Sequence, residues 1–437
     1  MPESMPKRSR PASIGGGEIF SGTTRDAGTG KDVPLEALRG IAALVVVLNH
    51  SILAFLPQYY GSGPLPSGGP HSLQGTLQYV FINGAGAVSL FFVLSGYVLT
   101  RRFCFTGETR ILMKGAVKRW PRLMGPVLAT VMLSYSLFYF HLYYFQQAGA
   151  KSGSDWLSLF GDSFFQMGQP PLTTAAIHLR GALEQGLYLV FFRGDYLYDS
   201  SLWTMRPELA GSLIAFGAAP ILLEARKSSP YLTIALAAAL VALLHFADSN
   251  LEAFPIGVAM AVLLPRGGRL PHVLAWPMLL LALYLLGYPG HAEGAYAALA
   301  WLEAQGMKGA EPMIVGAALT IGAVECFPPV RRAISGRLAA LLGKFSFPIY
   351  LVHVLVIFSA GSAIYLRYGT MPAFASVLLL SPVAALPLVW FNEWWVGRVN
   401  GWADALIRPR APAPRREEPP VAQPEATEPA RVSLNLN

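Results

Sequence analysis

Apolar residues run along this chain in long blocks that short polar segments interrupt. A block of about 20 apolar residues can cross a bilayer as a helix. Ten blocks approach or exceed that length, at 36–57, 77–100, 121–145, 201–223, 230–247, 250–265, 272–288, 309–327, 345–366 and 372–397. Residues 292–306 are amphipathic, which fits a re-entrant or interfacial piece. The pattern therefore predicts an all-α fold, a polytopic transmembrane helix bundle of about ten spans.

Composition supports a membrane protein and excludes other classes. Of the 437 residues, 53% are hydrophobic and 13% are charged, with a mean hydropathy of +0.44. Soluble globular proteins carry about 25% charged residues, so a soluble enzyme, a disordered chain and a coiled coil are excluded. The two cysteines lie far apart, and no HExxH or similar spacing is present, so we expect neither a disulfide framework nor a metal site.

The positive charges predict how the bundle is oriented. With the N-terminus in the cytoplasm, 26 of the 33 Lys and Arg residues lie on the cytoplasmic side and five lie on the other side. The positive-inside rule then predicts that both termini are cytoplasmic, in a plasma or inner membrane. Because this asymmetry accounts for the net charge of +8, we expect a lipid bilayer as partner and no nucleic acid.

Three parts of different composition follow one another along the chain. Residues 1–34 lack an apolar block and predict a disordered cytoplasmic N-terminus. Residues 35–397 form the predicted membrane domain, and its longest external loop, 146–200, is expected to cap the outer face. Residues 398–437 are rich in Pro, Glu and Ala and predict a disordered cytoplasmic tail.

The first predicted span carries two ionisable residues, Arg39 and His50. Eleven positions apart, they share one helix face and lie about 16 Å apart along its axis. Ionisable groups in hydrocarbon cost at least about 2.5 kcal/mol and therefore suggest function. A histidine can take a proton from a hydroxyl, and an arginine can hold a phosphate or carboxylate. In the structural alternative, Arg39 extends to the headgroups and His50 bonds to a neighbouring helix.

The predicted cytoplasmic segment 101–122 is the most basic of the chain, with seven Lys and Arg residues. Such a segment fits the positive-inside rule alone, and it equally fits a surface that binds phosphates of a lipid headgroup or a nucleotide. Arg119 and Arg122 are three residues apart and share one face where the third helix begins. Both are candidate substrate-binding residues.

Three other spans carry polar residues at membrane depth. Ser95 offers a hydroxyl in the second span, although small residues there also fit simple helix packing. Trp203 and Glu208 are expected near the outer end of the fourth span, where the carboxylate could orient the histidine of the first span or hold an acceptor hydroxyl. Tyr350 and His353 share a face of the ninth span, with packing or a structural polar bond as the alternative role.

In their order along the chain, these pieces resemble the acyltransferase-3 family of integral membrane acyltransferases. The similar motifs are Leu38-Arg39-Gly40 followed by His50, FFVLSGYV at 91–98, KRWPRL at 118–123, LWTMRPEL at 202–209 and GKFSFPIYLVHV at 343–354. The fourth motif differs from the Trp-Ser-Leu-x-x-Glu pattern that bacterial members more often carry. Together the motifs extend over nearly the whole predicted membrane domain.

The resemblance implies transfer of an acyl group, usually acetyl, from cytosolic acyl-CoA to a hydroxyl on a glycan or small molecule, with no bound cofactor. It implies that His50 and Arg39 are the catalytic pair of the first helix and that Glu208 is the acidic residue after the tryptophan motif. The remaining candidates are assigned to substrate binding: Arg119, Arg122, Ser95, Trp203, Tyr350 and His353.

In the mechanism we expect, arginines at the cytoplasmic face hold the phosphates of acyl-CoA while its pantetheine arm carries the thioester to His50. His50 then either deprotonates the acceptor hydroxyl or carries the acyl group itself, and the sequence leaves both open. The alternative from another class is a proton-coupled transporter or flippase without acyl chemistry, in which His50, Glu208 and His353 form a proton relay.

Overall fold

The computed structural model describes residues 32–60, 72–161, 177–264, 268–306 and 309–407. All regular elements in these ranges are helical, which confirms the predicted all-α class. The α-helices are α1 (Val33–Phe55), α2 (Gly84–Thr106), α3 (Thr109–Tyr139), α4 (Phe145–Ser152), α5 (Asp155–Ser158), α6 (Leu179–Glu184), α7 (Val190–Phe192), α8 (Met205–Ser228), α9 (Pro230–Ala247), α10 (Ala253–Leu263), α11 (His272–Leu286), α12 (Ala300–Ala304), α13 (Glu311–Cys326), α14 (Pro328–Ala333), α15 (Arg337–Val356), α16 (Ser362–Tyr368) and α17 (Thr370–Leu406). Short 3-10 or π-helical segments are η1 (Pro57–Tyr60), η2 (Leu77–Phe81), η4 (Gln185–Leu189), η5 (Ser200–Thr204), η6 (Ser249–Leu251), η7 (Gly294–Leu299) and η8 (Ile357–Gly361).

Six helical segments of the described chain are long and apolar enough to cross a membrane, which makes this an integral membrane protein. They are Val33–Phe55, Gly84–Thr106, Ser200–Ser228, Pro230–Ala247, Arg337–Tyr368 and Thr370–Leu406. The predicted count of about ten is not confirmed. Of the remaining predicted spans, α10, α11 and α13 are short helices, and α3 begins with a strongly basic stretch. Residues 292–306 form the short elements η7 and α12 and no span.

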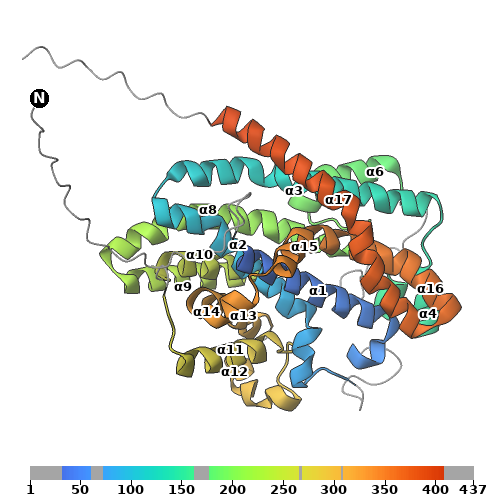
Figure 1. The fold of residues 1–437 in the computed structure, drawn as a ribbon, viewed down its shortest axis with the longest axis horizontal. Helices are drawn as coiled ribbons and strands as arrows, with labels where there is room; N and C mark the ends of the chain where they lie inside the picture. Colours follow the sequence, from blue (N-terminus) through green and yellow to red (C-terminus); the bar gives the residue numbers. More distant parts are fainter. Residues whose placement is uncertain (1–31, 61–71, 162–176, 265–267, 307–308, 408–437) are drawn as a thin grey trace, which may run out of the picture.

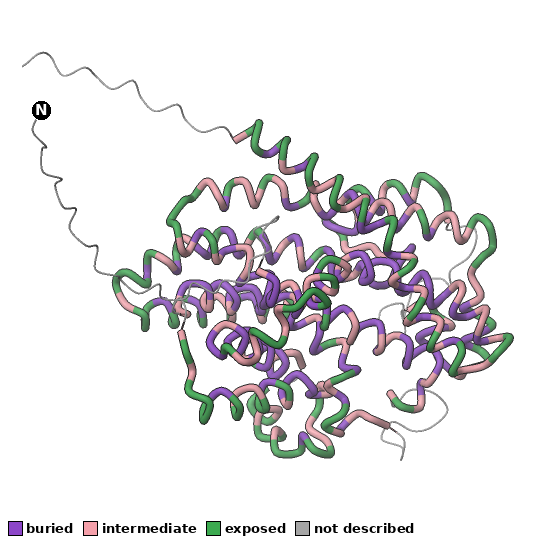
Figure 2. The backbone as a smooth tube through the Cα atoms, viewed as in Figure 1, coloured by how far each residue is buried: buried purple, intermediate pink, exposed green. Residues whose placement is uncertain are grey.

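Burial separates central helices from peripheral ones. In Figure 1, α3 and α17 run along the upper edge and α11 and α12 form the lower edge, with α1, α2 and α15 between them. The most apolar window of Arg337–Tyr368 is 72% buried, whereas that of α9 is 17% buried. Figure 2 shows the same division, with exposed positions gathered along the outer helices. The apolar surface of these outer helices is what the bilayer would cover.

Charged contacts define one end of the bundle, here called the basic end. Asp32, just before α1, accepts hydrogen bonds from Arg101 near the end of α2 (2.8 Å) and from Arg331 of α14 (2.7 Å). The end of α17 reaches the same region, where Lys114 of α3 pairs with Asp404. We call the opposite end, where α1 finishes and α2 begins, the distal end.

The largest boundary difference concerns α3, which begins at Thr109 rather than near residue 121. The predicted span began where the apolar block begins, and the basic residues before that block belong to the same helix. The chain instead turns at Gly107, whose φ of 71° ends α2 in a left-handed conformation that glycine adopts readily. The basic segment 101–122 is consequently helical on both sides of a tight turn.

Two other expected boundaries also move. The last helix, α17, continues to Leu406, beyond the predicted domain boundary at 397. In the predicted external cap, α4 and α5 lie at the distal end, but α6 and η4 run beside α3, where Trp120 donates a hydrogen bond to the Leu187 carbonyl (3.2 Å). The remainder of the predicted terminal segments, 1–31 and 408–437, lies outside the described residues.

Helices α2 and α10 cross at very short distance because each places a glycine at the contact. A Cβ atom at Gly96 would collide with the Phe254 carbonyl, and one at Gly257 would collide with the Val93 carbonyl. Small residues allow such close approach between membrane helices. The small residues beside Ser95 therefore do serve helix packing, and this contact holds the helix that carries Ser95 in place.

Candidate active site

A cavity of about 330 Å³ lies inside the bundle, between α1, α2, α3, α8, α15 and α17. On α2 its lining extends from Leu99 to Val88, which corresponds to about 16 Å along the helix axis. Six of the nine predicted site residues line it: Arg39, Ser95, Arg119, Arg122, Glu208 and Tyr350. His50, His353 and Trp203 are not among the lining residues.

Glu208 and Arg119 form an ion pair in the interior of the bundle. Ser95 donates a hydrogen bond to the same Glu208 oxygen (2.7 Å), and the Arg119 Nε donates to the Ser212 hydroxyl (2.7 Å). Arg119 is only 7% exposed, so the carboxylate supplies the charge that this buried guanidinium needs.

This contact corrects the predicted positions of both charged residues. Arg119 was expected at the cytoplasmic face and Glu208 near the outer end of a span. Ser95 and Arg119 each lie about 15–17 Å along their helices from the turn that joins α2 and α3, which places both at mid-bundle. Glu208 lies in the first turn of α8, which begins at Met205, and its contact with Arg119 places that turn at mid-bundle as well.

The other cations of the cavity differ in whether they have a partner. Arg39 pairs with Glu36 one turn earlier on α1 (2.6 Å), and Lys344 pairs with Glu393 of α17 (2.8 Å). Arg122 has no hydrogen bond or ion pair with any described residue. Arg122 is thus the cation that remains available to an anionic ligand.

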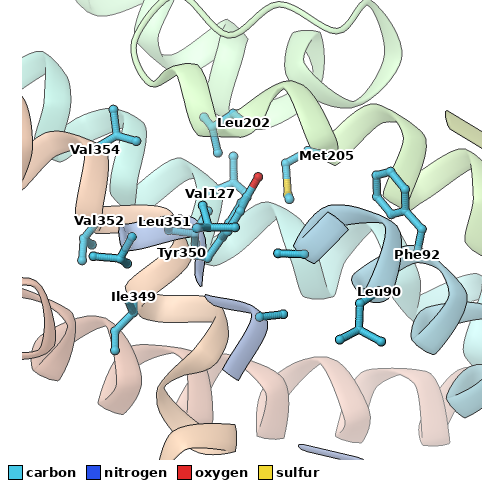
Figure 3. Packing of buried hydrophobic residues seen from close by; sticks show 14 of the residues in the cluster. Leu90, Phe92, Val127, Leu202, Met205, Ile349, Tyr350, Leu351, Val352 and Val354 are labelled. Carbon is cyan, nitrogen blue, oxygen red and sulfur yellow. The ribbon is translucent and has the colours of Figure 1, made fainter. Parts of the chain in front are cut away.

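Tyr350 closes the deeper end of the cavity. Its hydroxyl donates to the Ser201 carbonyl oxygen (2.8 Å) and lies 2.8 Å from the Thr204 hydroxyl. Its ring meets Phe91 edge-on, with 5.9 Å between ring centroids. Figure 3 shows Tyr350 among buried apolar side chains, near Leu202 of η5.

Immediately beyond Tyr350 lies a pair of histidines. The Nδ1 atom of His50 and the Nε2 atom of His353 are 2.8 Å apart, and the ring planes are parallel within 1°. Trp156 of α5 stacks on His50 with 4.8 Å between ring centroids. His353 is fully buried, whereas His50 keeps part of its surface exposed. The centroids of the Tyr350 and His353 rings are 5.9 Å apart, so His353 lies next to a residue that lines the cavity.

The hydrogen bonds determine which nitrogen of His50 is free. The Nδ1 atom of His353 lies 2.7 Å from the Tyr350 carbonyl oxygen, which can only accept, so Nδ1 carries the proton. The Nε2 atom of a neutral His353 then accepts from Nδ1 of His50. The lone pair of the His50 imidazole is consequently on Nε2, where it can take a proton from a substrate.

Comparison with known families agrees with this arrangement. A family model for an acyltransferase domain, that of the acyltransferase-3 family, matches residues 33–390, most of the chain. The chain belongs to the acyltransferase-3 family. No curated protein and no solved structure matches it. The matched range contains the two histidines, every predicted site residue of this membrane acyltransferase and all of the cavity lining except Asn392 and Glu393.

Sequence reasoning missed several residues of the acyltransferase that shape the cavity or contact His50. Glu36 could have been found, because it lies three residues before Arg39 on the same helix face. Thr204 belongs to the LWTMRPEL motif and lines the cavity, whereas the residue predicted from that motif, its neighbour Trp203, does not. Trp156 carries no local signal, since only the fold of the distal segment brings it onto His50.

Proposed function

We propose that this acyltransferase takes an acyl group, most simply acetyl, from cytosolic acyl-CoA and transfers it to a hydroxyl of a glycan or small molecule at His50. One observation carries the proposal: a cavity lined by three arginines reaches Tyr350, whose ring lies next to His353, and His353 is hydrogen-bonded to His50, a histidine whose Nε2 lone pair is free. The basic end would face the cytoplasm, as the positive-inside rule requires.

The cations of the cavity and of the basic end suit a donor that carries phosphates. In the cavity, Arg122 makes no hydrogen bond or ion pair within the described chain, and guanidinium groups bind phosphate with two parallel hydrogen bonds. A second hollow of about 240 Å³ lies beside the turn between α2 and α3, lined by Arg102, Glu108, Arg110, Ile111, Lys114 and Lys118. We assign the phosphates of CoA to these cations and the thioester to the part of the cavity that lies next to Tyr350.

In the reaction, Nε2 of His50 removes the proton of the acceptor hydroxyl while the oxygen attacks the thioester carbonyl. The new C–O bond forms, the C–S bond breaks, and the thiolate of CoA leaves and takes up a proton. His353 accepts the hydrogen bond from His50 Nδ1 and so keeps the imidazole oriented, as the third member of a catalytic triad does. A covalent acyl-His50 intermediate would use the same nitrogen.

The direct test is release of free CoA thiol from acetyl-CoA by the purified protein, with an envelope extract as the source of acceptor. We expect thiol release that requires both protein and extract. If the protein instead moves a solute across vesicle membranes and releases no thiol from any acyl-CoA offered, the proton-coupled transporter is the correct assignment.

Replacing Arg122 by alanine should raise the KM for acyl-CoA about tenfold and leave kcat nearly unchanged. A charge-assisted hydrogen bond contributes about 1.5 kcal/mol, and 1.4 kcal/mol corresponds to a factor of ten in affinity. Steady-state thiol release over a range of acyl-CoA concentrations measures both constants. Arg332→Ala is the matched control, because that arginine is exposed on α14 away from both hollows; an equal rise of KM there would remove Arg122 from the donor site.

A further inference from the structure

Three side chains that acyl transfer does not use meet at the distal end, outside the cavity. They are His245 at the end of α9, Glu252 at the start of α10 and Glu311 at the start of α13. The Nδ1 atom of His245 lies 2.9 Å from Oε2 of Glu252 and 3.6 Å from Oε1 of Glu311. One possible ligand atom of each side chain, the imidazole nitrogen or a carboxylate oxygen, lies within 4.8 Å of the other two.

The two carboxylates lack the partners that buried oxygens require. Oε1 of Glu252 and Oε2 of Glu311 are buried without any hydrogen-bond partner. Glu252 as a whole is only 2% exposed, and its side chain does not cap the helix it begins. Within the described ranges, no lysine or arginine pairs with either carboxylate, and His245 is their only ion-pair partner. An additional cation would satisfy oxygens whose burial is otherwise unfavourable.

We propose that His245, Glu252 and Glu311 bind a divalent transition-metal ion, with Zn²⁺ as the best match. Zinc takes imidazole nitrogen and carboxylate oxygen together, whereas Ca²⁺ and Mg²⁺ take oxygen ligands. Tetrahedral ligands about 2.0–2.2 Å from zinc lie about 3.3–3.6 Å from one another. The distance from His245 Nδ1 to Glu311 matches that range, the distance to Glu252 is shorter, and three protein ligands leave a fourth position for water.

Such an ion would hold together three helices that otherwise meet loosely at the distal end. Helix α9 has the lowest burial among the six candidate spans, at 17% of its apolar window. Helix α10 packs closely on α2 through Gly96 and Gly257. Zinc would therefore tie a peripheral helix to the one that supports Ser95. The sequence motifs gave no sign of this site, because the third ligand is 59 positions after the second.

The experiment uses the full-length protein, purified in detergent without a histidine tag, stripped with EDTA and dialysed against Zn²⁺. Bound metal is measured by mass spectrometry, and the midpoint of thermal unfolding is compared with and without Zn²⁺. The variants are Glu252→Gln and His245→Ala. Glu224→Gln is the matched control, because it makes the same chemical change at an exposed carboxylate of α8.

We expect about one Zn²⁺ per chain in the unaltered protein and in Glu224→Gln, with a higher midpoint when Zn²⁺ is present. Glu252→Gln and His245→Ala should lose at least nine tenths of the bound zinc and the shift of the midpoint. If Glu252→Gln does not fold, the zinc content of His245→Ala tests the site instead. The His245 side chain is 38% exposed, so its removal should disturb the fold less. Zinc retained by the variants, none bound by the unaltered protein, or Ca²⁺ bound in its place would overturn the proposal.

Discussion

Replacing His50 by alanine is expected to lower the rate of acyl transfer by about 10²–10⁴-fold, the usual contribution of a general base. The residue lies outside the cavity, so the KM for acyl-CoA should change little while kcat falls. Thiol release measured over a range of donor concentrations separates the two constants.

The control for this experiment is His141→Asn, which removes an exposed histidine with a φ of 55° and replaces it by a residue that tolerates that conformation. It should retain the rate of the unaltered protein. Equal rates for His50→Ala and the unaltered protein would show that His50 is not the base, and the proposed acyl-His50 intermediate would be excluded with it.

Removing the carboxylate of Glu208 should destabilise the fold by about 3–5 kcal/mol, because it leaves the buried charge of Arg119 without its partner. The measurement is equilibrium unfolding of Glu208→Ala in detergent. The double variant Arg119→Met with Glu208→Ala should recover much of that loss, since it leaves no buried charge.

An exposed pair provides the comparison. Arg180 and Glu184 of α6 form an ion pair with side chains 86% and 32% exposed, and water and salt screen such exposed pairs. Glu184→Ala should therefore change stability much less than Glu208→Ala does. A double variant as unstable as Glu208→Ala alone would mean that the carboxylate acts through Ser95 rather than through Arg119.

The helices were largely predictable, and their ends were less so. Long apolar blocks marked every long helix, since burying backbone polar groups in lipid demands helical hydrogen bonding. For α9 the predicted range agrees with the observed one. The start of α3 was wrong because an apolar block marks only the part of a helix that lies in the apolar environment, and α3 continues through the basic residues before it.

The candidate residues were predictable one by one, but their contacts were not. The spacing of Arg39 and His50 placed them on one face of a helix, but it cannot show that the cavity is lined by Arg39 and not by His50. The cavity ends at Tyr350, whose hydroxyl is held by Ser201 and Thr204 of a segment distant in sequence. The meeting of His50 and His353 likewise depends on how α1 packs against α15, where a Cβ at Gly343 would press on Glu36.

The closure at Tyr350 bears on the electrical insulation of the membrane. A water-filled passage between the two faces would let protons and sodium ions run down their gradients, at about 2.3 kcal/mol per charge for each 100 mV. Here the hydroxyl of Tyr350 is held by two polar partners, and tightly packed apolar side chains surround its ring. A closed contact of this kind, where the passage is not open to water, keeps the ion gradients across the membrane from discharging through the bundle.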